Sequence, residues 1–456
     1  MDTRSDTDRI TVDPASPTES GRPRKRGGSR PGRRPFRPLA LLAALVAATL
    51  VATPATAAPA ALPDRFVITG SGYGHGVGMP QYGAYEMSRR GSTAGGILRH
   101  YYQDTAVANR STPSLVDVQV YGPDPYSFSG YGDTSATTIT VRDGAWRLRA
   151  GEQTVASGPA GKLRVWTSRG DVVVRSGDRV IKRDKLVLQL AGTRYFRPDS
   201  TRSTAVVDGA HGTYQHGRLV LSASEGVPNI VNRLRLNSEY LWGLAEMPAS
   251  WGATGGAQAL RAQAIVGRSY ALLKRADWKR TCRCHLVDDV RDQYFSGNEV
   301  ASGFAGVHWV RAVNATDSSL TNGKVLVHGG RPVAAHYYSS SGGRTANSED
   351  VWSSVIPYER SEADPYSKAA PGNSYARWTR GIGQAKAQRL FGLGQVASIR
   401  VADRYSSGQA KTLVATSPSG RTARISGSAD TIRAKVGAAT FAGNVPAAWF
   451  TSIRAR

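Results

Sequence analysis

Apolar and polar residues alternate in short stretches from about residue 116 to residue 236, and Gly, Asp, Ser or Pro separates one stretch from the next. Alternation with a period of two and frequent turn residues is typical of strands that bury one face. The clearest stretches are residues 116–120, 163–166, 186–190, 218–222 and 231–236. Residues 373–456 have the same character, with candidate strands at 396–401 and 413–416. The pattern therefore predicts two β-rich regions.

A helical period appears between these regions. Within residues 257–276, Leu260, Ala264, Gly267 and Ala271 recur at intervals of four, three and four, which places them on one face of a helix. The spacing predicts a long helix with one buried stripe.

Two further segments favour helices. Residues 84–102 read as one helix, and a shorter helix is expected to begin at Ser238, a good N-cap residue. Pro248 should end that shorter helix just after Glu246. Strands and helices in separate segments of the chain indicate an α+β fold.

The N-terminus carries an export pattern. Residues 1–38 hold ten Lys/Arg against five Asp/Glu, residues 39–51 are apolar and uncharged, and Ala55-Thr56-Ala57 follows. A basic region, a short apolar region and an Ala-x-Ala site predict a secretory signal peptide over residues 1–57. An uncleaved signal anchor is the alternative, although the apolar run is short for a membrane span. We expect a protein that is secreted to the cell wall.

The chain is strongly basic, with 59 Lys/Arg, 34 Asp/Glu and a formal net charge of +25. Such a charge favours polyanions, which for an exported protein means anionic wall polymers. A merely solvated basic surface would have the same composition. No Lys/Arg cluster interleaved with aromatic residues is present, so nucleic acid is not an expected partner.

Glu246 is the first candidate for chemistry. At a helix C-terminus its carboxyl would meet the negative end of the helix dipole, and Leu244, Met247 and Trp251 would desolvate it. Both effects raise the pKa of a carboxyl, which suits a general acid near neutral pH. The alternative is a glutamate that points into solvent beside a proline.

Five blocks of the sequence together resemble the SpoIID/LytB family of cell-wall proteins. The blocks are Tyr240-Leu-Trp-Gly-Leu-Ala-Glu-Met-Pro-Ala-Ser-Trp251, Gln258-Ala-Leu-Arg-Ala-Gln-Ala-Ile-Val-Gly-Arg-Ser-Tyr-Ala271, Tyr337-Tyr-Ser-Ser-Ser-Gly-Gly-Arg-Thr345 with Glu349-Asp-Val-Trp352, Gly72-Tyr-Gly-His-Gly-Val-Gly-Met-Pro-Gln-Tyr-Gly-Ala84, and Ile425-Ser-Gly427 with Ile432-Arg433 and Phe441. The Gly/His block precedes the catalytic segment here, an order typical of actinobacterial members. Arg261 stands where the family usually has lysine, and residues 110–210 have no counterpart.

The resemblance implies a domain plan. After the signal peptide, residues 58–108 form a Gly-rich module of the core, and residues 109–214 form a β-rich insertion. Residues 215–370 form the SpoIID-like catalytic core, in which a short and a long helix pack on a β-sheet. Residues 371–456 form a C-terminal β-rich part of that core.

The resemblance also implies a lytic transglycosylase that cuts peptidoglycan glycan strands stripped of their stem peptides. A muramic acid residue carries its own 6-hydroxyl, which can close on the anomeric carbon and give a 1,6-anhydro end. A single carboxyl, Glu246, then suffices as acid and base, whereas ordinary glycosidases need two. The expected mechanism needs no cofactor.

The substrate-binding residues that the resemblance implies are Arg261, Arg268, Tyr337, Ser341 and Asp350. Arginines could bind the lactyl carboxylate or orient sugars, although ordinary surface charges would look the same. His75 lies among glycines that let a backbone approach a ligand closely, so we expect it to line the groove. A tight turn whose His caps neighbouring backbone is the other interpretation.

Cys282 and Cys284, with His285, leave three possibilities open: a zinc site, a short-loop disulfide or free thiols. Three ligands within four residues rarely close a tetrahedron, so zinc would need a fourth ligand such as Asp288 or Asp289. An exported protein favours the disulfide.

Two rival functions remain. The first is a non-catalytic glycan-binding module that activates a cell-wall amidase, a role that the LytB branch suggests. The second is a metallohydrolase built on His75 and the cysteine cluster, for which the sequence offers no spaced ligand set. A glutamate at position 246 favours chemistry over the binding module.

Overall fold

The computed structural model of the chain describes residues 62–127, 130 and 132–456, so the predicted signal peptide lies outside the described residues. Helices and mainly antiparallel sheets alternate in it, which confirms the α+β prediction. Among the described residues, no helix has both the length and the apolar character that a membrane span requires.

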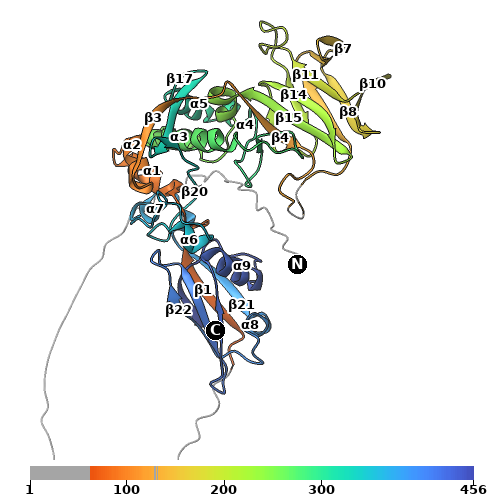
Figure 1. Cartoon of the computed structure of the whole chain (residues 1–456). Helices are drawn as coiled ribbons and strands as arrows, with labels where there is room; N and C mark the ends of the chain where they lie inside the picture. The colour runs from red at the N-terminus through yellow and green to blue at the C-terminus, as the bar shows by residue number, and fades with distance from the viewer. Residues whose placement is uncertain (1–61, 128–129, 131) are drawn as a thin grey trace, which may run out of the picture. The chain divides into compact units, whose positions relative to one another are not determined.

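The strands predicted between residues 116 and 236 form two sheets that share one core (Figure 1). The larger sheet has the order β16 (Leu286–Val287), β4 (Leu115–Tyr121), β15 (Val227–Arg235), β14 (Arg218–Ser224), β11 (Lys185–Leu190), β6 (Trp146–Ala150), β7 (Gln153–Gly158). The smaller has the order β10 (Arg179–Arg183), β9 (Asp171–Ser176), β8 (Gly161–Ser168), β5 (Thr137–Arg142), β12 (Thr204–Val207), β13 (Thr213–Tyr214). Along β8, Leu163 and Val165 are buried while Lys162 and Arg164 are exposed, as a period of two requires.

The long helix is α3 (Ala257–Lys274), close to its predicted range. It packs against α1 (Gln81–Arg89), α2 (Ala94–Tyr101), α5 (Gly306–Asn314) and the strand β18 (Asn322–His328). β18 pairs with β3 (Thr105–Ser111), β17 (Asp317–Ser319) and β19 (Arg331–Pro332). The buried face of α3 is wider than the single stripe that the spacing predicted, because Gln263 and Arg268 are also fully buried.

The single helix predicted over residues 84–102 is wrong, since the segment forms the two helices α1 and α2. Gly91 adopts a left-handed φ of +88° that ends the first helix. The Thr93 hydroxyl then caps the second by accepting a hydrogen bond from the Gly96 N–H at 3.1 Å. A left-handed glycine and a threonine cap therefore divide into two helices the segment that the pattern predicted as one.

The C-terminal residues form a second core together with the first described strand. β1 (Arg65–Ser71) lies between β21 (Trp378–Gly383) and β25 (Trp449–Ala455) and pairs antiparallel with both. The same core includes residues of α8 (Gln384–Phe391), α9 (Ala429–Ala439), β22 (Ser398–Arg404) and β23 (Ala410–Thr416), and β24 (Thr422–Ser426) pairs with β23. The remaining short elements are α4 (Glu299–Ser302), α6 (Ser348–Val351), α7 (Tyr366–Ala369), η1 (Leu236–Tyr240), η2 (Ala249–Thr254) and η3 (Ser374–Ala376).

A two-residue parallel ladder joins β2 (Met79–Pro80) to β20 (Tyr337–Tyr338). It places the Gly-rich segment beside residue 337, although more than 250 positions separate them in sequence. This ladder positions the site described next.

Candidate functional site

Glu246 does not lie at a helix C-terminus, so that prediction is wrong. Helical structure ends by Trp242, and the chain then pairs with residues 294–296. The Ala245 N–H donates to the Tyr294 carbonyl at 2.9 Å, and the Ser296 N–H donates to the Gly243 carbonyl at 2.9 Å. A Cβ on Gly243 would lie only 2.4 Å from the Phe295 ring, so this close pairing requires glycine.

The Glu246 carboxyl is held by two donors in a mostly buried position. The Tyr294 N–H donates to its Oε1 at 2.7 Å, and the Tyr337 hydroxyl is its second partner. Burial raises the pKa of Glu246, while the hydrogen bonds from Tyr294 and Tyr337 oppose that rise by stabilising the ionised form. Residue Glu246 as a whole nevertheless keeps part of its surface accessible. Burial, and not a helix dipole, therefore raises the pKa of this carboxyl and favours its protonated form.

A chain of directed hydrogen bonds leads to this carboxyl. The Tyr240 hydroxyl donates to Gln293 Oε1 at 2.8 Å, and Gln293 Nε2 donates to the Tyr337 hydroxyl at 3.0 Å. Because an amide Nε2 can only donate, the Tyr337 proton is left to point at Glu246. Burial also raises the pKa of both tyrosines, so they stay protonated. Gln293 thus fixes the direction in which Tyr337 donates.

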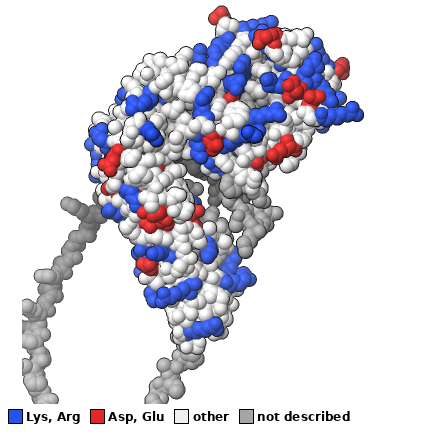
Figure 2. All heavy atoms as spheres, in the orientation of Figure 1, with Lys and Arg blue, Asp and Glu red and all other residues white. Residues whose placement is uncertain are grey.

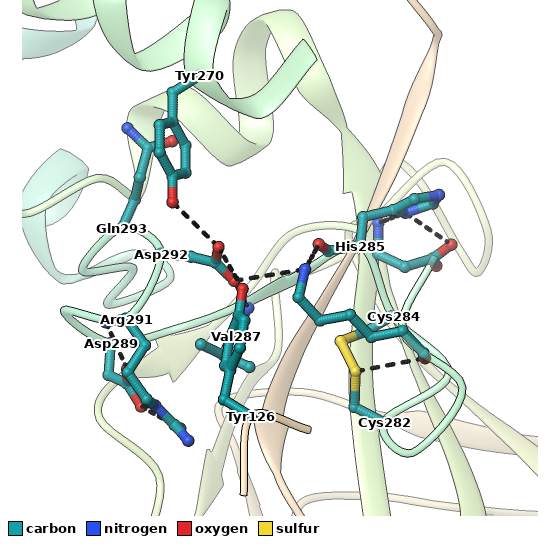
Figure 3. A network of polar contacts seen from close by, with 12 residues as sticks. Tyr126, Tyr270, Cys282, Cys284, His285, Val287, Asp289, Arg291, Asp292 and Gln293 are labelled. Atoms are coloured by element: carbon teal, nitrogen blue, oxygen red, sulfur yellow. Dashed lines mark hydrogen bonds and ion pairs between the residues drawn. A yellow bond between two sulfur atoms is a disulfide. The ribbon is translucent and has the colours of Figure 1, made fainter. Parts of the chain in front are cut away.

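Asp292 anchors the loop that carries Gln293 (Figure 3). Its carboxylate accepts from the Tyr270 hydroxyl at 3.1 Å, from the Tyr126 hydroxyl at 2.8 Å and from the Val287 N–H at 2.9 Å. Lys279 Nζ lies 3.7 Å from the same carboxylate. A buried carboxylate with this many partners holds the backbone that places Gln293 and Tyr294.

His75 supports Tyr337 from the other side. Its Nδ1 accepts from the Val77 N–H at 3.1 Å, so Nε2 carries the proton and donates to the Tyr337 carbonyl at 3.1 Å. Burial first, and then the nearby His336 and Arg433, lower the pKa of His75 to about 3, so the ring is neutral. Both nitrogens are occupied by backbone groups, which agrees with the interpretation of His75 as a cap on a tight turn.

The glycines around His75 allow this close approach. Gly78 has a φ of +75°, and a Cβ there would lie 2.1 Å from the His336 carbonyl. The Trp352 ring lies 5.1 Å from His75 and 4.7 Å from His336, and 37% of the Trp352 surface is exposed. An exposed aromatic ring therefore borders the support of Tyr337.

Comparison with known proteins addresses the segment around Glu246. A profile of the family described as stage II sporulation protein, SpoIID, matches residues 224–328, which include Glu246 and Gln293. Residues 224–328 are therefore similar to the SpoIID family. Its match to stage II sporulation protein D of Bacillus subtilis (strain 168) is 31% identical over 140 residues, which is 29% of this chain and 40% of that protein.

Two further relatives match parts of the chain. Stage II sporulation protein D of Bacillus amyloliquefaciens is 30% identical over 140 residues, again 40% of its length. An amidase enhancer of Bacillus subtilis (strain 168) is 33% identical over 113 residues, which is 25% of this chain and 13% of that protein. This chain thus spans less than half of each relative. No solved structure matches it.

The two arginines expected to bind substrate differ in their surroundings. Arg261 lies half-exposed on α3, within the residues that match the family profile. Arg268 is fully buried and donates to Asn237 Oδ1 at 3.0 Å, to Thr316 Oγ1 at 3.1 Å and to the Lys324 carbonyl at 2.9 Å. Burial lowers its pKa to about 10. A spacing of seven put both on one helix face, but that face turns into the core at residue 268, which leaves Arg268 no surface for a ligand.

Ser341 and Asp350 lie beyond the matched segment. Ser341 is fully buried, and its hydroxyl donates to Asp364 Oδ2 at 2.5 Å, so it stabilises a loop and does not reach a ligand. Asp350 is partly exposed on α6 and accepts from Asn347 Nδ2 at 3.0 Å. The contacts therefore bring together Glu246, Tyr337 and His75 from the predicted set, with Asp350 two residues from Trp352.

Cys282 and Cys284 form a disulfide, one of the three possibilities that the sequence left open (Figure 3). Joined sulfurs are not thiolates and do not ligate zinc in this state. His285 Nδ1 accepts from the Asp117 N–H at 3.0 Å, and burial lowers the pKa of His285 to about 4. Within the described ranges, no group of three or more His, Cys, Asp or Glu side chains is arranged for a metal ion.

Sequence reasoning missed Gln293, Tyr294 and Trp352 as parts of the site. A single glutamine carries no periodic signal, and Tyr294 acts through its backbone, which any residue has. Trp352 closes the segment Glu349-Asp-Val-Trp352, and an aromatic residue so near two acidic residues was the signal that could have indicated it.

Proposed function

We propose that this chain is an exported lytic transglycosylase that cleaves peptide-stripped peptidoglycan glycan between N-acetylmuramic acid and N-acetylglucosamine. The observation that carries the proposal is Glu246, a partly exposed residue whose carboxyl has a pKa raised by burial. A raised pKa favours the protonated form that a general acid requires. The similarity to stage II sporulation protein D supports the assignment.

In the first half of the reaction, Glu246 gives its proton to the glycosidic oxygen as the bond from that oxygen to C1 of the muramic acid breaks. The leaving N-acetylglucosamine departs with a free 4-hydroxyl. The Glu246 carboxylate that forms is stabilised by the Tyr294 N–H and the Tyr337 hydroxyl, the two donors already in place.

In the second half, the 6-hydroxyl of the same muramic acid attacks C1 and loses its proton to Glu246. The product is a 1,6-anhydro end, no water is consumed, and Glu246 returns to its protonated form. Among the described groups, no acidic side chain contributes to the pKa shift of Glu246. This supports a mechanism with one carboxyl over one with two, because paired carboxyls about 5 to 9.5 Å apart would influence each other.

The test is mass spectrometry of the fragments released from wall glycan that an amidase has first stripped of peptides. We expect 1,6-anhydromuramic ends from the wild-type chain. Reducing muramic ends would indicate hydrolysis and a second carboxylate, and would contradict the proposal.

A non-catalytic glycan-binding module that activates a cell-wall amidase is the second candidate, because an amidase enhancer is among the relatives. In that case the Glu246→Gln variant would activate a co-incubated amidase as well as the wild type does, and neither would release glycan fragments by itself. The two functions therefore separate in one assay.

A further inference from the structure

A cavity of about 360 Å³ lies where the β-rich strands meet the helical segment that precedes Glu246. Three segments contribute to its wall: the chain after β11, the turn between β13 and β14, and the end of β15 with the helix that follows. The lining residues are Gly192, Thr193, Arg194, Arg202, Gln215, His216, Gly217, Arg235, Ser238, Glu239 and Trp242. The proposed mechanism does not use this cavity, and of its lining residues Trp242 alone stands in one of the five blocks that resemble the family.

The lining carries more positive than negative charge. Arg194 forms an ion pair with Glu239, and Glu239 Oε2 also accepts from the backbone N–H of Arg235 at 2.8 Å. The side chains of Arg202 and Arg235 form no ion pair with any carboxylate in the described part of the chain. The lining therefore holds three arginines and one glutamate, and two of these arginines have no ionic partner among the described residues.

The uncharged side of the cavity is rigid and amphipathic. Trp242 is held by a hydrogen bond from its Nε1 to Asn314 Oδ1 at 2.9 Å, and its ring lies 5.6 Å from that of His216. Gln215 donates to Thr204 Oγ1 at 2.7 Å and accepts from Asn298 Nδ2 at 2.9 Å. Burial lowers the pKa of His216, so this ring adds no charge near neutral pH. An indole ring beside guanidinium groups suits a sugar that carries an anion.

We propose that this cavity binds the anionic group of a sugar, a carboxylate or a phosphate, with Arg202 and Arg235 as its ionic partners and Trp242 against the sugar ring. The basic side chains spread over the visible surface attract polyanions without selecting among them (Figure 2). The cavity adds geometry to that attraction, because planar guanidinium groups bind carboxylate or phosphate with directed hydrogen bonds. Trp242 lies four residues before Glu246, so an occupied cavity would contact the segment that carries the acid.

The proposal is tested by ligand-observed NMR titration of the full chain with three small probes. N-acetylmuramic acid carries a lactyl carboxylate, glucose 1-phosphate carries a phosphate, and N-acetylglucosamine is neutral. We expect at least one anionic sugar to bind more tightly than the neutral one. Binding of the carboxylate alone would point to glycan stripped of peptides, and binding of the phosphate alone would point to wall phosphate polymers.

The double variant Arg202→Gln/Arg235→Gln should weaken that binding by about tenfold or more, since charge-assisted hydrogen bonds are lost. The matched control is Arg164→Gln/Arg179→Gln, which removes the same charge from exposed positions of β8 and β10. It should change affinity by less than about twofold, because separated exposed charges are screened. Thermal unfolding checks the fold of each variant, and the single Arg202→Gln change at an exposed position serves if the double variant is unstable.

Equal losses in both double variants would show diffuse attraction and overturn the proposal, as would equal binding of neutral and anionic sugars or no binding of either anion. The probes are monosaccharides and the readout is binding, so the result is independent of glycan cleavage. A failure of the Glu246 mechanism would leave this test unchanged.

Discussion

The paired strands β8 and β9 and the surroundings of Glu246 are both well buried, but they bury different kinds of side chain. In β8 and β9 the buried positions are apolar, as at Leu163, Val165 and Val174, each fully buried. Around Glu246, Tyr240 and Gln293 are polar although only 1% of the surface of each is exposed. Each of them has a hydrogen-bond partner contributed by another part of the chain.

The difference teaches what each kind of burial demands. An apolar interior position needs only the right face of a strand, and its neighbours supply the rest. A buried polar group needs one specific partner, because leaving it unsatisfied costs about 1–3 kcal/mol. Substitutions around Glu246 should therefore reduce turnover, whereas substitutions at the apolar positions of β8 and β9 should reduce stability.

The largest expected effect on glycan cleavage comes from Glu246→Gln. Gln is nearly the same shape and still accepts the Tyr294 N–H, but it cannot deliver a proton. We expect turnover on stripped glycan to fall by roughly a hundred- to ten-thousand-fold. Glu152→Gln in the turn between β6 and β7 is the control, because that side chain is fully exposed and its ion pair is with Arg149. Near-normal turnover in Glu246→Gln would remove the central claim.

The same variant should also differ from the wild type in stability. A carboxyl whose folded-state pKa is raised loses stabilising free energy as pH rises above its unfolded pKa of about 4.3. Glu246→Gln lacks this loss, so its unfolding temperature should exceed that of the wild type increasingly from acid to neutral pH. A constant difference across that range would contradict the raised pKa.

Tyr337→Phe should have the next largest effect, a fall in turnover of about tenfold, because one charge-assisted hydrogen bond is lost. The Tyr337 hydroxyl lowers the pKa of Glu246, so its removal raises that pKa further. A general acid loses activity as pH rises through its pKa, and the alkaline limb of kcat/KM should therefore move to higher pH. A shift to lower pH would show that Tyr337 does not donate to Glu246.

Gln293→Glu tests whether the amide directs Tyr337. A carboxylate at position 293 accepts from both Tyr240 and Tyr337, which withdraws the Tyr337 hydroxyl from Glu246. We expect a smaller, severalfold loss of turnover and a shift of the alkaline limb in the same direction as for Tyr337→Phe. If the limb stays in place while only the unfolding temperature falls, Gln293 has a structural role alone.

Leu163→Ala belongs to the other region and should leave turnover per folded molecule unchanged. Removing a fully buried leucine typically costs about 2–5 kcal/mol, because a cavity remains. Chemical denaturation with a parallel activity assay separates the two effects. A loss of turnover in the folded variant would mean that the sheets and the site are energetically coupled.

Metal removal should have the smallest effect. The proposed mechanism passes its proton between Glu246 and sugar oxygens, and Cys282 and Cys284 are joined to each other. Dialysis against a strong chelator should leave turnover within about twofold of the untreated protein, since metal catalysis would contribute several kcal/mol. Loss of activity that zinc restores would contradict this prediction, and elemental analysis would show whether the protein binds zinc.

The same contrast explains what the sequence could predict. The strand at 163–166 and the helix from Ala257 follow from local periodicity, and both are present. The face of α3 that holds Arg268 could not be assigned, because a spacing of seven shows which residues share a face and not where it points. The helix expected to end at Glu246 depended on Pro248, but Gly243 stops it earlier by pairing closely with Phe295. Gln293 carries no local signal at all.

The placement of β1 between β21 and β25 sets an order of events during synthesis. The turn that holds His75 depends on residues made much later, since Gln409 donates to the His75 carbonyl at 3.0 Å and the Gly74 N–H donates to the Pro446 carbonyl at 3.0 Å. At common translation speeds those residues follow roughly 20 to 80 s after His75. A shorter fragment of the chain therefore lacks the hydrogen bonds from Gln409 and to Pro446 that hold the His75 turn beside Tyr337.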